Sequence, residues 1–299
     1  MQKNILFLFF LLITADVCAF VKEVAPGIYV HIGKHLDVDD GYDGDICNIG
    51  FIVGEHSIAV IDSGGSYLVG KKLKSYITEN FKQPIKYVIN THPHLDHIYG
   101  NVVFSSAKFY GHANLTKAMR VREEIYKNLN EKYLGTISKK SPLILPDEMV
   151  NIGEDKVIDL GQRHIILQSF PEAHTEADLI VLDKNTKTLW AGDLVFRERT
   201  PVVDGNIHGF INALEVIQKK EIDMVIPGHG EPSTKEEAVQ PILNYLVQLR
   251  DDIRKFIDNG ESLEFAMENA ANSQKDDWLL FEIQNQRNVN LIFPMMEWE

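Results

Sequence analysis

Residues 92–97 form the segment whose side chains are best suited to chemistry. They are His-Pro-His-Leu-Asp-His, so three imidazoles and one carboxylate directly follow an apolar run. Imidazole and carboxylate groups suit Zn²⁺ and neighbouring first-row metals. Structural zinc sites more often use Cys, whereas a His/Asp set leaves room for water. The segment therefore predicts a catalytic metal site.

Three later segments share one form, in which an apolar run ends in a turn marked by Gly or Pro that carries one His or Asp. These segments are residues 170–175, 189–193 and 225–230, and their candidates are His174, Asp193 and His229. Ligands at strand ends can converge while sheets hold them rigidly. A Gly beside a ligand also lets the backbone approach closely. We therefore expect the four segments to build one site.

Hydrophobic spacing indicates the elements that position these segments. Strands are expected at residues 28–32, 47–53, 58–62, 86–91, 108–111, 156–160, 164–170, 179–183, 188–191 and 224–226. Helices are expected at residues 66–80, 113–133, 209–220 and 234–259, and residues 261–299 should be mostly helical or irregular. Strands dominate both halves and helices lie between them. This order favours an α/β fold with two stacked sheets flanked by helices.

Composition limits the partners of the protein. The chain has 299 residues, a net charge of −13, and 24% charged residues. A nucleic-acid binder needs a basic face that neutralises phosphates, and no basic stripe is visible. We therefore expect a small-molecule substrate and no nucleic acid.

The first 19 residues have the layout of a secretory signal peptide. A short positive start, Met1-Gln2-Lys3, precedes an apolar stretch and then small residues up to Ala19. The apolar stretch is shorter than the roughly 20 residues that span a bilayer, so no membrane span is expected after cleavage. The mature protein would be periplasmic or secreted. Its one cysteine, Cys47, is interpreted as a buried strand residue rather than a reactive thiol.

Taken together, these motifs resemble those of the metallo-β-lactamase-fold hydrolases. The resemblance rests on residues 91–97, 173–175, 192–193 and 227–230, together with Val-Ile-Asp-Ser-Gly at 60–64. It implies an αββα sandwich with a di-metal site at one edge. It also implies a metallo-β-lactamase-like domain over residues 20–232, with a C-terminal helical extension over residues 233–299 packed on the same domain.

Carried over residue by residue, the resemblance implies two Zn²⁺ sites and a shared hydroxide between them. The first metal would be bound by His92, His94 and His174, the second by Asp96, His97 and His229, and both by Asp193. Asp96 would also be catalytic by orienting the hydroxide. Asp62 would accept a hydrogen bond from a ligand His or the nearby loop.

Asp193 narrows the activity that the resemblance implies. It stands where broad-spectrum zinc β-lactamases carry a Cys ligand, whereas a bridging Asp is typical of thioester hydrolases, lactonases and phosphodiesterases. The expected reaction is hydrolysis of a small ester, thioester, lactone or amide, with β-lactamase activity as a lesser alternative. Persulfide dioxygenases share ligands like His92, His174 and Asp193 around one Fe²⁺, so a mononuclear iron dioxygenase stays open.

One exported branch of this fold is similar over nearly the whole mature chain. The branch is the quinoprotein relay system zinc metallohydrolases, and the similar residues are 23–31, 44–46, 49–54, 201–205 and 296–299. The resemblance implies association with a periplasmic quinoprotein or cytochrome. Substrate-binding residues cannot be identified from the sequence. Candidates to line the pocket are Arg197, Asp204, Asn206 and His208.

Overall fold

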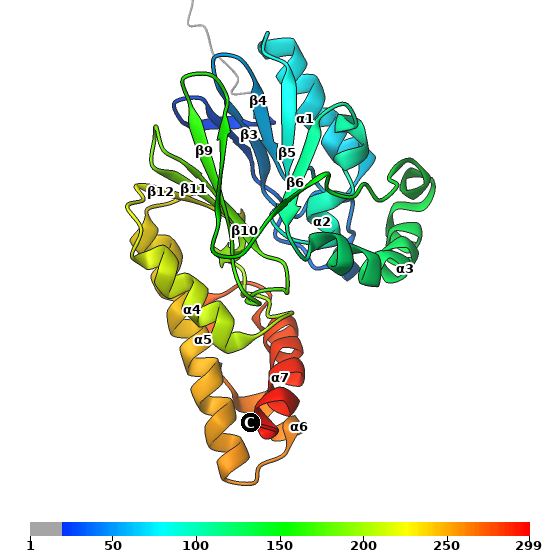
Figure 1. Ribbon diagram of the computed structural model, residues 1–299. Coiled ribbons are helices and arrows are strands. Elements are labelled where there is room, and N and C mark those ends of the chain that lie inside the picture. The colour runs from blue at the N-terminus through cyan, green and yellow to red at the C-terminus, as the bar shows by residue number, and fades with distance from the viewer. Residues whose placement is uncertain (1–19) are drawn as a thin grey trace, which may run out of the picture.

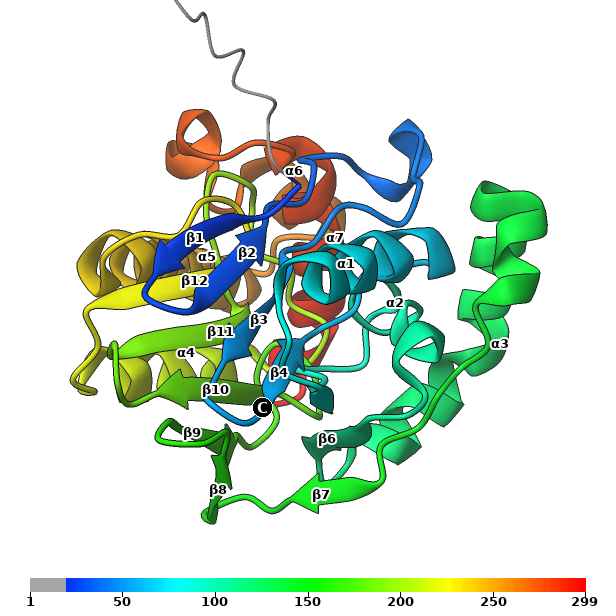
Figure 2. The same cartoon turned by 90° about the horizontal axis from the view of Figure 1, so that it is seen from above.

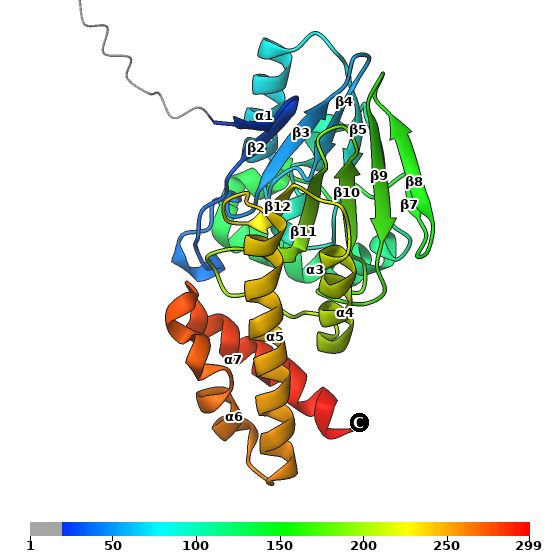
Figure 3. The same ribbon diagram turned by 90° about the vertical axis from the view of Figure 1, so that its left-hand side faces the viewer.

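The computed structural model describes residues 20–299, so the signal peptide expected over residues 1–19 lies outside the described residues. Two β-sheets face each other, and helices cover both outer faces (Figure 1). This arrangement confirms the predicted α/β class and the αββα sandwich. Seen from the side, the C-terminal helices extend past the end of the sandwich (Figure 3).

The first sheet contains seven strands that lie side by side in sequence order. They are β1 (Lys22–Ala25), β2 (Ile28–His31), β3 (Ile49–Val53), β4 (Ile58–Ile61), β5 (Ile85–Ile89), β6 (Lys108–His112) and β7 (Glu148–Val150). The pairs from β1 to β4 are antiparallel, and those from β4 to β7 are parallel. Strand β4 is wholly apolar and buried, as expected for a strand covered on both faces. The sequence did not predict the short edge strands β1 and β7.

The second sheet contains five strands in the order β12-β11-β10-β9-β8. They are β8 (Asp155–Asp159), β9 (His164–Ser169), β10 (Leu179–Asp183), β11 (Thr188–Phe196) and β12 (Met224–His229). Strand β11 is buried along its whole length and pairs in parallel with β12. The parallel pairing brings the carboxyl ends of β11 and β12 to the same edge of the sheet.

Apolar side chains fill the space between the sheets. Ile61 and Ile89 of the first sheet belong to one buried cluster with Leu179 and Trp190 of the second. The two sheets therefore bury a shared core, which holds their edges in a fixed relation.

Helices cover the outer faces of both sheets (Figure 2). On the first sheet, α1 (Tyr67–Asn80) packs through Leu73 and Ile77, which are one helical turn apart. The second sheet is covered by α4 (Ile207–Gln218) and α5 (Lys235–Asp258). The other helices before β7 are α2 (Leu95–Ile98), α3 (Leu115–Leu134), η1 (Val38–Asp40), η2 (Asn101–Phe104) and η3 (Gly135–Lys140).

The segment after β12 is mostly helical. It comprises α5, α6 (Leu263–Asn269), η4 (Asn272–Asp277) and α7 (Phe281–Glu297). Helix α5 begins at a capping box, in which Thr234 and Glu237 each bind the other's backbone N–H. Leu246 and Val289 of the extension share a buried cluster with Leu189 of β11. In residues 20–299, no helix is both long and apolar enough to cross a membrane.

Candidate metal centre

The segment 92–97 leaves the carboxyl end of β5 and forms a short helix. His94 is the N-cap of α2, and Asp96 and His97 lie within that helix. The sequence did not predict this short helix. Adjacent helical residues point in different directions, yet the ends of these two side chains meet, with Asp96 Oδ2 3.5 Å from His97 Nε2.

The other three candidates come from the second sheet. His174 lies in the connection between β9 and β10, and His229 is the last residue of β12. Asp193 was predicted just beyond a strand, but it lies inside β11, which continues to Phe196. The pairing of β11 with β12 changes register around Gly192, whose φ is +52°. Such an irregularity changes the direction of nearby side chains, so Asp193 can contribute to the site although it lies inside a strand.

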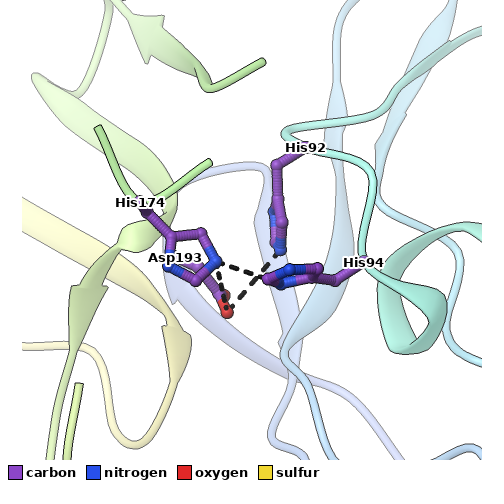
Figure 4. A group of neighbouring side chains, drawn as sticks. All are labelled: His92, His94, His174 and Asp193. Atoms are coloured by element: carbon purple, nitrogen blue, oxygen red, sulfur yellow. Dashed lines mark hydrogen bonds and ion pairs between the residues drawn. The ribbon is translucent and has the colours of Figure 1, made fainter. Parts of the chain in front are cut away.

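Four side chains converge in the first ligand set (Figure 4). They are His92, His94, His174 and Asp193, and their ligand atoms all lie within 4.8 Å of one another. Asp193 Oδ2 is 3.6 Å from His92 Nε2 and 3.5 Å from His174 Nε2. His94 presents Nδ1, which is 3.1 Å from His174 Nε2.

A second set also surrounds the Asp193 carboxylate. His97 Nε2 is 3.2 Å from Asp193 Oδ1, and His229 Nε2 is 3.2 Å from Asp193 Oδ2. Asp96 Oδ2 is 3.5 Å from each of these two imidazole nitrogens. The structure thus brings all seven predicted ligands together, with Asp193 facing both sets.

The donor atoms fit metal ions, and three of them have no hydrogen-bond partner. Ligands held about 2.1 Å from one tetrahedral zinc lie about 3.4 Å apart, close to the spacing seen here. Within residues 20–299, His92 Nε2, His97 Nε2 and Asp193 Oδ1 are buried and have no hydrogen-bond partner. Buried polar atoms are rarely left unpaired, and a bound cation would give these three atoms a partner.

Asp62 binds both His97 and Thr91, the residue that precedes the 92–97 segment. Its Oδ2 accepts a hydrogen bond from His97 Nδ1 at 2.8 Å and one from Thr91 Oγ1 at 2.7 Å. Its Oδ1 accepts from the Thr91 backbone N–H at 2.9 Å. Asp62 has a φ of +52°, a conformation that costs energy for a residue other than glycine. The hydrogen bonds are those expected of a residue that orients His97.

The other imidazoles are oriented in the same way, through the nitrogen that faces away from the centre. Asp204 Oδ2 lies 3.0 Å from His94 Nε2 and also accepts from Arg122 at 2.9 Å. The backbone carbonyls of Val202 and Ile46 accept from Nδ1 of His174 and His229, both at 2.7 Å. These bonds leave one nitrogen of each ring free to bind a metal.

The electrostatics of the centre favour neutral imidazoles in the first set. Burial lowers the pKa of His92 and lowers that of His174 to about 4. Burial also opposes charge on His97, but the negative groups around it raise its pKa above the ordinary value. Burial opposes charge on Asp193 as well, yet the surrounding imidazoles hold its pKa well below the usual range. Asp193 is therefore ionised and ready to bind a cation.

Two glycines are required where the backbone approaches the site. A Cβ on Gly228 would lie 1.9 Å from Asp193 Oδ1, and one on Gly192 would lie 2.6 Å from the Thr91 side chain. Any larger residue at Gly228 would therefore displace the carboxylate that both ligand sets share. This is the close approach that the turn glycines predicted.

Cys47 is buried directly before β3 and lies behind the second set. Its thiol lies 2.9 Å from the backbone carbonyl of Asp96 and can donate to it. Burial raises the pKa of this thiol to about 12, so it is protonated at neutral pH. Its burial and protonation agree with the expectation that Cys47 is not a reactive thiol, but the expected strand position is wrong, because β3 begins only at Ile49.

A cavity of about 250 Å³ opens over the centre. Of the four predicted pocket residues, Asp204 lines it and Arg197 does not. Asn206 instead caps α4, and His208 lies 3.2 Å from Glu299. The charged and amide residues of its wall that the sequence did not single out are Asp37, Arg199, Gln284 and Arg287.

The missed residues come from segments without a recognisable pattern. Gln284 and Arg287 belong to α7, almost a hundred residues after Asp193. No spacing in the sequence indicates that α7 returns to the metal ligands. Only the packing of the extension on the second sheet brings it there.

Comparisons with known proteins agree with this geometry. A sequence model described as "Metallo-beta-lactamase superfamily" matches residues 42–229. A metallo-β-lactamase structure from Pontibacter korlensis has a TM-score of 0.59 and 18% identity, covering 76% of this chain and 98% of its own. A second, from Hirschia baltica, has a TM-score of 0.59 and 17% identity, covering 76% and 96%.

Among curated proteins, no sequence matches this chain. The structural neighbours are too distant in sequence to indicate more than the fold. The family match, in contrast, covers more than half of the chain and includes all seven ligands of the centre. The chain belongs to the metallo-β-lactamase superfamily.

Proposed function

We propose that the protein is a di-zinc hydrolase that cleaves a small ester, thioester, lactone or amide. One observation carries the proposal, namely that the Asp193 carboxylate faces two complete ligand sets. Its Oδ1 lies 3.2 Å from His97 Nε2, and its Oδ2 lies 3.5 Å from His174 Nε2. When bound, two zinc ions would polarise a carbonyl group and lower the pKa of a shared water.

Different residues would bind the two zinc ions, orient the water and orient the imidazoles. The first ion would be held by His92, His94 and His174, the second by Asp96, His97 and His229, and both by Asp193. Asp96 also lines the cavity, where its carboxylate can accept a hydrogen bond from water and orient it toward a substrate. Asp62 and Asp204 hold two of the imidazoles in place, so the ligand geometry exists before a substrate arrives.

Two other activities are outcomes of the same test. A mononuclear iron dioxygenase acting on a persulfide would need only the first set, and the second set would then lack a purpose. β-Lactam hydrolysis is the lesser alternative. The side chain that both sets share, Asp193, is a carboxylate, and a carboxylate can bind oxygen-preferring ions as well as zinc. Metal analysis is therefore needed to identify the ion.

Metal analysis combined with an activity panel tests the proposal. The purified protein should contain two zinc ions per chain and hydrolyse a member of a panel of thioesters, lactones, phosphodiesters and β-lactams. Hydrolysis should be lost on chelation and restored by zinc. One iron per chain, with oxygen consumption in the presence of a persulfide, would overturn it.

The site of action and the partner also belong to this proposal. Cleavage of the signal peptide expected over residues 1–19 would leave the hydrolase in the periplasm or outside the cell. The association with a quinoprotein or cytochrome stays a prediction from resemblance. Fractionation of cells that express the full chain would test the first point, and co-purification would test the second.

A further inference from the structure

Arg122 of α3 binds two carboxylates that come from different segments beside the first ligand set. Its Nη1 donates to Glu176 Oε1 at 2.6 Å, and its Nη2 donates to Glu176 Oε2 at 2.9 Å. The same Nη2 also donates to Asp204 Oδ2 at 2.9 Å. Glu176 lies in the connection between β9 and β10, and Asp204 lies in the loop between β11 and α4. A single side chain therefore joins α3 to both segments.

Both segments also carry or orient a histidine of the first set. Glu176 follows His174 by two residues, and the Asp204 backbone N–H donates to the His174 carbonyl at 2.9 Å. Asp204 Oδ2, which accepts from Arg122, is the oxygen that lies 3.0 Å from His94 Nε2. Arg122 is thus connected to two of the three histidines of the first set, although its own hydrogen bonds within residues 20–299 end on other residues.

The two carboxylates would repel each other without the arginine. Both accept from the same Arg122 nitrogen, so they lie close together and carry like charge. Burial acts to raise the pKa of Glu176 and the charge of Asp204 acts in the same direction, but Arg122 holds this pKa below its ordinary value. Removal of the guanidinium charge would therefore favour movement of the two groups apart. A shift of Asp204 would weaken its hold on His94.

Other contacts hold Arg122 itself in place. Its side chain is 15% exposed, and its Nη1 also donates to the Ala118 carbonyl, one turn earlier in α3, at 3.2 Å. The planar guanidinium pairs with Glu176 through two parallel hydrogen bonds, which fixes the direction of the third toward Asp204. The wall of the metal cavity does not include Arg122, so it would not contact a substrate. An effect of Arg122 should therefore be seen in metal binding.

We propose that Arg122 is a positioning residue for the first metal ion. By neutralising Glu176 and Asp204 together, it keeps Asp204 beside the nitrogen of His94 that faces away from the metal. The inference rests on the metal centre of the proposed function and does not depend on the reaction catalysed. It requires that one of the two ions be affected and the other not, because the partners of Arg122 lead to His94 and His174 and not to the second set.

Zinc affinity tests the inference without turnover. Metal-free wild type and Arg122→Gln are titrated with zinc in competition with a chromophoric chelator. We expect Arg122→Gln to bind one ion about tenfold more weakly, since His94 loses its orienting acceptor, and the other ion as wild type does. The same substitution in His97→Ala, where only the first set is complete, should weaken the remaining ion by a similar factor and so identify the site.

The decisive comparison is a rescue by a second substitution. Glu176→Gln removes the charge that would repel Asp204, so Arg122→Gln combined with Glu176→Gln should regain most of the lost zinc affinity. A purely structural role predicts no rescue, because the double variant still lacks every hydrogen bond that Arg122 donates. Arg122→Lys keeps the charge without the planar geometry and should lose less affinity than Arg122→Gln.

The control is Arg120→Gln, which removes the same charge two residues earlier in α3. Arg120 is exposed and pairs with Glu123 at 2.7 Å, so this variant should bind both ions as wild type does. Urea unfolding of the metal-free proteins shows whether each variant folds. If Arg122→Gln does not fold, Arg122→Lys takes its place in the comparison, with and without Glu176→Gln.

Three results would overturn the inference, namely unchanged zinc binding in the Arg122 variants, equal weakening of both ions, and no rescue by Glu176→Gln. A loss at one ion that Glu176→Gln restores would support it. Because no substrate is present in these titrations, a failure to hydrolyse any ester would count against the proposed function and leave this inference standing.

Discussion

At the scale of single residues, Asp193 connects the two ligand sets. Its two carboxylate oxygens lie 3.2 Å to 3.6 Å from imidazole nitrogens of His92, His97, His174 and His229. Both sets would lose a negatively charged ligand if this one side chain were removed. The effect of a substitution at Asp193 should therefore differ from that at any ligand of one set.

We expect Asp193→Ala to lose both metal ions after dialysis against a weak chelator. The control is His97→Ala, which should lose one ion and retain the other, because His97 lies only in the second set. Elemental analysis of both variants gives the number of ions per chain. Two tightly bound ions in Asp193→Ala would exclude the shared role, and equal losses from both sites in His97→Ala would exclude the division into sets.

Asp204 acts on the first set through His94. Its Oδ2 lies 3.0 Å from His94 Nε2. Burial acts to raise the pKa of Asp204, but His94 and, after it, Arg122 hold that pKa well below the usual range. We expect Asp204→Ala to weaken zinc binding at the first set by about 10- to 100-fold, since His94 loses the acceptor that orients it. Asp204→Asn keeps an acceptor and should be affected less. Competition with a chromophoric chelator measures both, and identical affinities for all three proteins would contradict this role.

The two arginines after β11 show why part of the site could not be predicted. Arg197 and Arg199 are alike in sequence and two residues apart, and the sequence favoured Arg197 as a pocket residue. In the structure, Arg199 is the buried one, and its backbone forms an isolated β-bridge with Leu279. The seven residues of the two sets could be singled out from the sequence because they lie in motifs that resemble those of a known family. The burial of Arg199, in contrast, depends on the segment at Leu279, which lies 80 residues further along the chain.

At the scale of elements, α5, α7 and the loop after β11 are joined by a buried polar network. Asn288 of α7 donates to the Pro201 carbonyl at 2.7 Å and accepts from Val203 N at 2.9 Å. It also donates to Tyr245 Oη of α5 at 2.9 Å. Between the two anchored positions lies Val202, whose carbonyl accepts from His174 Nδ1. The extension therefore supports a metal ligand through the backbone.

We expect Asn288→Ala to lower the free energy of unfolding by about 2–4 kcal/mol, because it leaves two backbone groups unpaired in the interior. Zinc affinity at the first set should also fall, since the loop that orients His174 is released. The control is Tyr245→Phe, which removes a hydroxyl of the same network but keeps both bonds to the loop. Urea unfolding and zinc titration of the two variants separate these effects. A loss of stability with unchanged zinc affinity would contradict the link to His174.

At the scale of the whole molecule, the sandwich could be predicted from the sequence because its strands are short, apolar and regularly placed. The bounds of β11 could not, since the strand continues through Gly192 and Asp193, residues that usually mark a turn. Burial between β10 and β12 overrides that local preference. The return of α7 to the cavity was unpredictable for a similar reason, because it depends on packing over the second sheet.

The stability of the whole molecule should depend on pH through Asp178. Burial raises the pKa of Asp178 to about 7, although hydrogen bonds from Thr175 N and Thr175 Oγ1 oppose the shift. In the unfolded chain this carboxyl has a pKa near 3.9. Between these two values the folded state retains a proton that the unfolded state has lost. The contribution to stability is therefore full below about pH 4 and is lost as the pH rises to about 7.

Asp178→Asn should remove this dependence, because the amide cannot ionise and can still accept from Thr175 N. In metal-depleted protein, the stability of the wild type should fall relative to the variant between about pH 4 and pH 7, by no more than about 4 kcal/mol. Urea unfolding of both proteins across that range gives the difference, in which the other titrating groups cancel. Above pH 7 the difference should be constant, since Asp178 is then ionised in both states. Parallel stability curves over the whole range would mean that Asp178 is ionised in the folded protein, held as a carboxylate by Thr175 despite its burial.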